Sequence, residues 1–145
     1  MRTRWLAVAA AIAGLGFGAP AALKAQPKPT PTLDYDFFKN RVEPIFLKKK
    51  PGHTRCVVCH SESNNMFKLE ALPKGAAMWT EDQSRRNFEM VKNIIVPGDP
   101  ENSRLTKHPL APEAGGDPFH SGGRQFASKT DPDWMVLLQF VNGAK

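Results

Sequence analysis

The chain has 145 residues, of which 41% are hydrophobic and 23% are charged. This length suits one domain with one hydrophobic core, and the composition is that of a folded protein rather than a disordered one. The formal net charge is +6, but no basic stripe with interleaved aromatic residues is present, which argues against nucleic-acid binding. Thirteen prolines and eleven glycines predict long irregular connections between few regular elements.

Residues 1–25 have the pattern of an export signal. Arg2 and Arg4 precede an uncharged run rich in Ala and Gly, and Ala19-Pro20-Ala21 matches the A-x-A cleavage pattern. The alternative is an uncleaved membrane anchor, for which the uncharged run is barely long enough and which Pro20 disfavours. We therefore expect a periplasmic or otherwise exported protein, tethered to the membrane only if this segment is retained.

Two further parts follow the signal. Residues 26–33 are a proline-rich linker that we expect to be extended. Residues 34–145 are expected to form the folded domain, without internal repeats. No segment alternates as a strand does, so the predicted fold class is mainly α, with about three helices and long loops.

The first predicted helix begins at Asp34, whose side chain suits an N-cap. Hydrophobic residues follow at i, i+4, i+7 and i+8 and share one helical face: Phe38, Val42, Ile45 and Phe46. Pro44 lies within this stretch and is expected to kink or divide the helix.

The second predicted helix begins at Thr80, where Thr80-Glu81-Asp82-Gln83 forms a capping box. It is expected to end before Pro97-Gly98, and its hydrophobic positions are Phe88, Val91 and Ile94 or Ile95.

The third predicted helix has Asp131 as N-cap and Pro132 at its first position. It is expected to end at Asn142-Gly143, and its hydrophobic positions are Trp134, Leu137, Leu138 and Val141.

Cys56-Val57-Val58-Cys59-His60 carries the most specific chemical signal in the chain. Its C-x-x-C-H spacing is typical of covalent attachment of c-type haem. Two cysteines at this spacing lie about one turn of backbone apart, so both sulfurs reach the vinyl groups along one porphyrin edge, and the next residue's imidazole reaches the iron. We therefore predict one haem c, attached through thioethers at Cys56 and Cys59 and ligated on its proximal side by His60.

Three other interpretations of the two cysteines are weaker. A structural zinc site needs four ligands, so both thiolates would have to recruit two of the four histidines without a second Cys-x-x-Cys. A thioredoxin-like redox pair is expected after a strand in a βαβ context, which this sequence lacks. A plain disulfide between Cys56 and Cys59 is compatible with an oxidising compartment.

The order of elements resembles the class I cytochrome c fold, in which an N-terminal helix, the haem motif, an intervening helix and a C-terminal helix follow one another. Two segments are similar to parts of small bacterial cytochrome c domains: Arg41-Val42-Glu43-Pro44-Ile45-Phe46, and His120-Ser121-Gly122-Gly123 with Asp131 to Trp134. The resemblance covers about residues 36–143. It implies that the first and last helices cross and pack together, that the loops wrap one covalent haem, and that the His-x-Gly-Gly segment supplies the sixth iron ligand.

The loop between the second and third predicted helices holds two histidines and no methionine. Glycines lie on both sides of His120 and let the backbone approach a flat ring closely. We therefore prefer His120 as the distal iron ligand, and His108 is the first alternative.

Methionine is the other common sixth ligand. Met78 is the best methionine candidate because it lies in a loop-like stretch. Met90 and Met135 lie in predicted helices, where methionine usually fills the core, and Met66 follows His60 too closely to pass round the porphyrin. The candidates for contact with the haem propionates are Trp79, Arg85, Arg86, Arg104 and Arg124, although each of them is more often an ordinary surface residue.

Two strong protein ligands would leave no open position on the iron. We therefore expect a carrier of single electrons between redox partner proteins and not an enzyme, with no small-molecule substrate and no nucleic-acid partner. One alternative is a haem subunit of a larger membrane oxidoreductase complex. The other is a haem enzyme or gas sensor with an open distal site, although a peroxidase of this kind usually carries two haem motifs and this chain has one.

Overall fold

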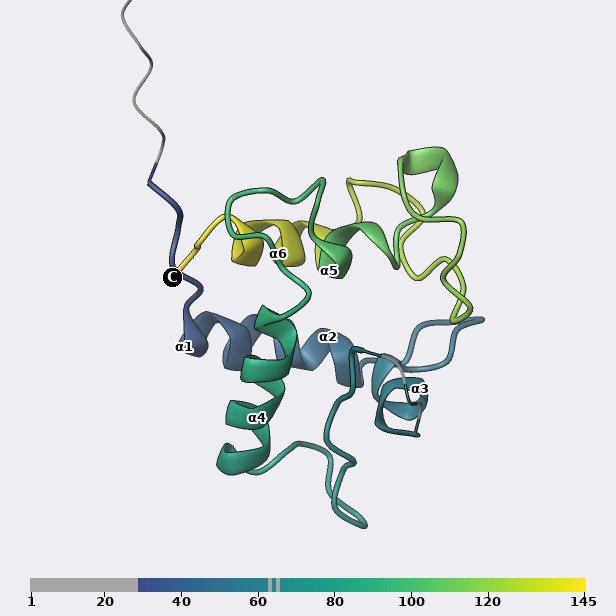
Figure 1. Ribbon diagram of the computed structural model, residues 1–145. Coiled ribbons are helices and arrows are strands. Elements are labelled where there is room, and N and C mark those ends of the chain that lie inside the picture. The colour runs from purple at the N-terminus through teal and green to yellow at the C-terminus, as the bar shows by residue number, and fades with distance from the viewer. Residues whose placement is uncertain (1–28, 63, 65) are drawn as a thin grey trace, which may run out of the picture.

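The computed structural model describes residues 29–62, 64 and 66–145 (Figure 1). Within these residues the chain forms eight helical segments and no β-strand, so the fold class is mainly α, as predicted. The predicted export segment 1–25 and the first part of the linker lie outside the described residues. No helix in the described part of the chain is long and apolar enough to cross a membrane.

The first helical stretch consists of three consecutive segments, α1 (Tyr35–Phe37), the π-helical η1 (Phe38–Val42) and α2 (Glu43–Leu47). Asp34 is its N-cap, as predicted, because the carboxylate accepts a hydrogen bond of 2.7 Å from the Phe37 amide. Pro44 lies in the first turn of α2. Proline has no N–H to bond the carbonyl four residues back, and the preceding π-helical turn changes the hydrogen-bond register at this point. The predicted division of the helix near Pro44 is therefore confirmed.

α4 (Glu81–Lys92) begins at the predicted capping box. The hydroxyl of Thr80 accepts from the Gln83 amide at 3.3 Å, and the Gln83 side chain accepts from the Thr80 amide at 3.1 Å. The helix ends before Ile94 and Ile95, so the expectation that it continues through them is wrong. Their amides bond to carbonyls three residues back, and this tighter turn still buries both side chains.

α6 (Pro132–Val141) begins and ends as predicted. Asp131 Oδ1 accepts from the amides of Asp133 at 2.9 Å and Trp134 at 3.3 Å. Gly143 follows the C-cap with φ +80°, a left-handed conformation that favours glycine.

The sequence pattern does not predict three further helical segments, which are α3 (Cys56–Glu62), α5 (Arg104–Lys107) and the 3₁₀ segment η2 (Pro112–Ala114). The longest of them has seven residues. A segment this short spans too few turns for its hydrophobic period to be recognised.

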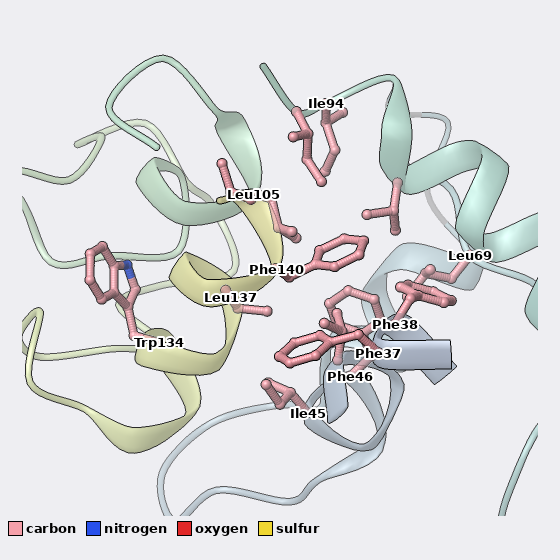
Figure 2. Close-up of a cluster of buried hydrophobic side chains, with 14 of the residues drawn as sticks. Phe37, Phe38, Ile45, Phe46, Leu69, Ile94, Leu105, Trp134, Leu137 and Phe140 are labelled. Atoms are coloured by element: carbon pink, nitrogen blue, oxygen red, sulfur yellow. The ribbon is translucent and has the colours of Figure 1, made fainter. Parts of the chain in front are cut away.

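The first helical stretch packs against α6 through aromatic side chains (Figure 2). The ring of Phe140 stacks on Phe37, with ring centres 6.2 Å apart and planes 4° from parallel, and its centre lies 5.9 Å from that of Phe38. Phe38 and Phe140 are fully buried. The first and last helices therefore pack together, as expected. α3 and the loop between α5 and α6 lie at the end of the molecule away from the C-terminus (Figure 1).

Residues just before α1 pack on the end of α6. A Cβ added to Gly143 would lie 2.6 Å from Pro31 Cβ, and one added to Gly98 would lie 2.9 Å from Pro31 Cδ. Leu33 also packs against the hydrophobic core. The last residues of the predicted linker thus contact the domain directly.

Replacing Gly143 by Ala should lower the free energy of unfolding by about 2–5 kcal/mol. Left-handed strain contributes about 1–2 kcal/mol, and the clash with Pro31 contributes a further ~1–3 kcal/mol. Gly52→Ala is the matched control, because Gly52 has φ +75° and nothing within 4 Å of an added Cβ. Urea denaturation should show a clearly smaller loss for the control. Equal losses would mean that the Pro31 contact adds nothing.

Glu43 is a buried carboxyl group between α2 and α4. Glu43 is only 4% exposed, and Ser84 Oγ donates a hydrogen bond of 2.7 Å to Glu43 Oε1. Burial raises the pKa of Glu43, and the bond from Ser84 and the charge of Lys39 oppose part of that rise. The folded protein therefore favours the protonated carboxyl more than the unfolded chain does.

A raised pKa in the folded state makes stability depend on pH. The contribution of Glu43 is fully present below the ordinary pKa of about 4.3 and is lost as the pH rises through the folded-state value. Glu43→Gln keeps an acceptor for Ser84 and removes this titration. From about pH 4 to pH 7 the wild type should lose free energy of unfolding relative to the variant. Urea denaturation of both proteins at both pH values measures this. A difference that does not change with pH would contradict the raised pKa.

Candidate functional site

A cavity of about 530 Å³ lies between α3, α5 and the loop that precedes α6. Its volume is within the range of about 300–1,000 Å³ that is common for ligand pockets. Apolar side chains form much of its wall: Ile45, Phe46, Phe67, Ile94, Leu105, Phe126 and Leu137. Five of the predicted site residues also border it, namely Cys56, Cys59, His60, His108 and His120.

α3 carries both cysteines of the motif. Cys56 and Cys59 are at i and i+3 and so lie on the same helical face, one turn apart, and neither is in a disulfide. Burial raises the pKa of the Cys56 thiol to about 11, whereas Cys59 is exposed. The two sulfurs border the same cavity but differ in their access to solvent.

His60 follows in the same helix, and a backbone carbonyl orients its ring. Its Nδ1 lies 2.7 Å from the carbonyl oxygen of Phe67, which can only accept, so Nδ1 carries a proton. In the neutral imidazole the lone pair is then on Nε2. The Phe67 ring packs against the imidazole with ring centres 4.6 Å apart. This tautomer is the one that a metal ligand bound through Nε2 requires.

His120 lies close to His60 in space, although the two are far apart in sequence. Their ring centres are 6.3 Å apart, and the ring planes are 13° from parallel. His120 Nδ1 lies 2.8 Å from the carbonyl oxygen of Gly123, so its lone pair is also on Nε2. Burial lowers the pKa of His120, and the nearby His108 and His60 lower it further, against the opposing bond to Gly123. Burial and the two neighbouring histidines therefore favour the neutral imidazole, which is the form that binds metals.

The loop that carries His120 is tied together at its base. The Ala111 amide bonds to the Phe126 carbonyl at 2.9 Å, and the Phe126 amide bonds to the Pro109 carbonyl at 3.1 Å. Gly116 crosses this base so closely that an added Cβ would lie 1.9 Å from the Leu110 oxygen. Only glycine allows this approach. The close contact and the two hydrogen bonds together fix where the loop begins.

α6 holds α5 beside the cavity. The indole Nε1 of Trp134 donates a buried hydrogen bond of 2.9 Å to the carbonyl of Thr106. Leu105 and Arg104, which precede Thr106 in α5, both border the cavity.

Gly122 lies directly against the imidazole of His120. A Cβ at this position would lie 3.0 Å from Cε1 and 3.3 Å from Nε2 of the ring. Glycine thus keeps a methyl group away from the nitrogen that would bind a metal. The expected close approach of this glycine backbone to a haem ring stays a prediction.

His108 borders the same cavity, but its ring nitrogens have different partners. Nδ1 lies 2.7 Å from Asp117 Oδ2, and Nε2 lies 3.3 Å from Arg104 Nη2. The pKa of Asp117 is lowered, mainly by the hydrogen bond from the Phe119 amide and also by the bond to His108. The ring centre of His108 is 5.2 Å from that of His120, with planes 55° apart. His108 is therefore a neighbour of His120 that is already engaged at both nitrogens.

The structure does not bring Met78 to this cavity. Met78 is exposed and borders a separate hollow of about 270 Å³, together with Glu43 and Trp79. Met66, expected to lie too close to His60 in sequence, does border the larger cavity.

Of the candidates for propionate contact, Arg104 borders the cavity. The other four have partners elsewhere: Trp79 donates to the Glu70 carbonyl, and Arg85, Arg86 and Arg124 pair with Glu81, Glu70 and Glu113. The sequence pattern does not single out Arg55, which also borders the cavity. Its place directly before Cys56 is the signal that could have identified it.

The spacing of His60 and His120 fits one metal ion bound by both rings. With a metal–nitrogen bond of about 2.0 Å, as imidazole makes to zinc, and about 1.2 Å from nitrogen to ring centre, two coaxial imidazoles would have centres about 6.4 Å apart. The observed separation is 6.3 Å. Together with the cysteines in α3 and the apolar wall, these residues fit a covalently attached haem.

Within the described ranges, no group of three or more His, Cys, Asp or Glu side chains is arranged as a metal-binding cluster. Comparisons with protein-family models, curated proteins and solved structures found no match to this chain.

Proposed function

We propose that this chain is an exported c-type cytochrome that carries single electrons between redox partner proteins. One haem is attached through Cys56 and Cys59, with His60 as proximal and His120 as distal iron ligand. The partners are redox proteins outside the cytoplasm, including a membrane oxidoreductase complex if residues 1–25 are retained as an anchor.

One observation carries this proposal. His60 and His120 border the same cavity with nearly parallel rings, and their ring centres are separated by the distance calculated for two coaxial imidazoles on one metal ion. Both cysteines of the C-x-x-C-H motif border the same cavity. The same motif, with an export signal before it, would provide covalent attachment in the compartment where c-type haem is added.

Bound haem supplies an iron that changes between Fe(III) and Fe(II), which is the one-electron chemistry of the proposal. The chain's residues provide its surroundings. The carbonyl groups of Phe67 and Gly123 accept hydrogen bonds from Nδ1 of His60 and His120. In the neutral ring the lone pair that would bind the iron is then on Nε2. The apolar part of the wall would provide surroundings of low polarity. Arg55 and Arg104 offer forked N–H donors to carboxylates such as propionates.

The proposed fold is a class I cytochrome c-like domain. The packing of the first helical stretch against α6 through Phe37, Phe38 and Phe140 supports this assignment. So does the position of the motif in a short helix directly after that stretch.

Covalent attachment has a direct test. The protein should keep its haem peroxidase stain on a denaturing, reducing gel, because a thioether survives both treatments. Changing Cys56 and Cys59 together to Ala should abolish the stain. Val58→Ala is the matched control, since Val58 is an exposed residue between the same cysteines, and it should keep the stain. If haem extracts from the wild-type protein into acid-acetone, the proposal is wrong.

The distal ligand is tested by comparing two histidine variants. The wild-type iron should be six-coordinate and low-spin, and His120→Ala should open the distal position, giving a high-spin species that binds carbon monoxide when reduced. His108→Ala should leave the low-spin spectrum unchanged, because His108 is bonded to Asp117 and Arg104 instead. Optical spectra of both redox states measure this.

Two outcomes would reassign the distal ligand. If His108→Ala and not His120→Ala opens the iron, His108 is the ligand. A Met–Fe(III) charge-transfer band in the wild type would exclude both histidines.

A further inference from the structure

The segment after α3 carries the carbonyl that orients His60. Phe67 supplies this carbonyl, and two residues later the Leu69 amide bonds to the His60 carbonyl at 2.9 Å. Leu69 is only 2% exposed. The segment from Phe67 to Leu69 therefore wraps the end of α3 and contacts His60 through both its ring and its backbone.

Glu70, the next residue, is fixed at both of its backbone polar groups. Its N–H donates to Asn87 Oδ1 at 2.8 Å, and its carbonyl accepts from Trp79 Nε1 at 2.7 Å. Asn87 is fully buried in α4, and Trp79, just before α4, is 7% exposed. The exposed side-chain pair with Arg86 adds little by comparison. α4 and the residue before its cap thus hold the chain three residues from the carbonyl that bonds His60.

Asn87 is an unusual choice for this position if only stability matters. Its Nδ2 is buried and has no hydrogen-bond partner among the described residues. An unpaired buried amide group disfavours folding, and an apolar residue of similar volume avoids that penalty. What asparagine provides here is an acceptor directed at the Glu70 N–H.

We propose that Asn87 and Trp79 are positioning residues for the proximal ligand. They hold Glu70 so that the Phe67 carbonyl stays in line with the Nδ1–H of His60. A well-placed carbonyl partner orients a ligating imidazole and increases its donor strength. The effect on the iron rests on the proposed function, whereas the positioning of the His60 ring does not.

Asn87→Leu and Trp79→Phe test this proposal in the full-length protein as purified. Leucine removes the acceptor and keeps a side chain of four heavy atoms branched at Cγ, with a somewhat larger volume. Phenylalanine removes the indole N–H and keeps an aromatic ring. The first readout is the rate at which the His60 Nδ1 proton exchanges with solvent, measured by NMR with the protein reduced if it carries haem. Each variant should speed exchange by about five- to tenfold, the factor that corresponds to one lost hydrogen bond of ordinary strength. The second readout is the midpoint potential, which should rise in both variants as His60 becomes a weaker donor.

Ser84→Ala is the matched control. Ser84 lies in the same helix and is equally buried, but its hydroxyl bonds to Glu43 and not to the segment around Glu70. It should reduce stability without changing either the exchange rate or the potential.

The outcomes separate this proposal from the proposed function. If Asn87→Leu and Trp79→Phe lower stability as Ser84→Ala does and leave the Nδ1 exchange unchanged, both residues are structural and the inference is overturned. Should Asn87→Leu fail to fold, Trp79→Phe decides the matter by the same exchange measurement. Absence of covalent haem from the wild type would overturn the proposed function, while the exchange rates would still decide the positioning role.

Discussion

The contact of Phe140 with Phe37 and Phe38 holds the beginning and the end of the domain together, and the candidate site depends on it. α3 follows α2 after eight residues, and the loop with His120 leads directly into α6. The position of α6 relative to the first helical stretch therefore sets the distance between the two histidines. Lys48 and Lys50 reinforce this arrangement through ion pairs with Asp133 and Asp131 at 2.9 and 3.1 Å. Such partly exposed pairs contribute modestly, so the buried aromatic rings are the main constraint.

Local signals in the sequence predict well where the longer helices begin. Asp34, Thr80 and Asp131 are caps because their side chains reach amides within three residues, a distance over which the sequence alone is informative. The end of α4 depends instead on how Ile94 and Ile95 enter the core, and this requires the neighbouring elements to be known. α3 and α5 are too short to show a hydrophobic period.

The candidate site is predictable to the same extent. The C-x-x-C-H motif selects Cys56, Cys59 and His60 as candidate residues without any knowledge of the fold. The two histidines of the long loop are different, because their flanking residues do not reveal that His108 bonds to Asp117 and Arg104. Nor does the sequence indicate that backbone carbonyls of Phe67 and Gly123 orient His60 and His120. A carbonyl is present at every residue, so only the path of the chain shows which one is used.

Pro31 packs against Gly143 at one end of the molecule, so the segment before α1 and the C-terminal residues leave the domain side by side. α3 and the loop with His120 lie at the opposite end (Figure 1). A group joined to the C-terminal residues, such as a fusion partner, an affinity tag or a linkage to an electrode, is therefore held away from the residues that line the cavity. The domain can be immobilised through its C-terminal end with the cavity on the side away from the support.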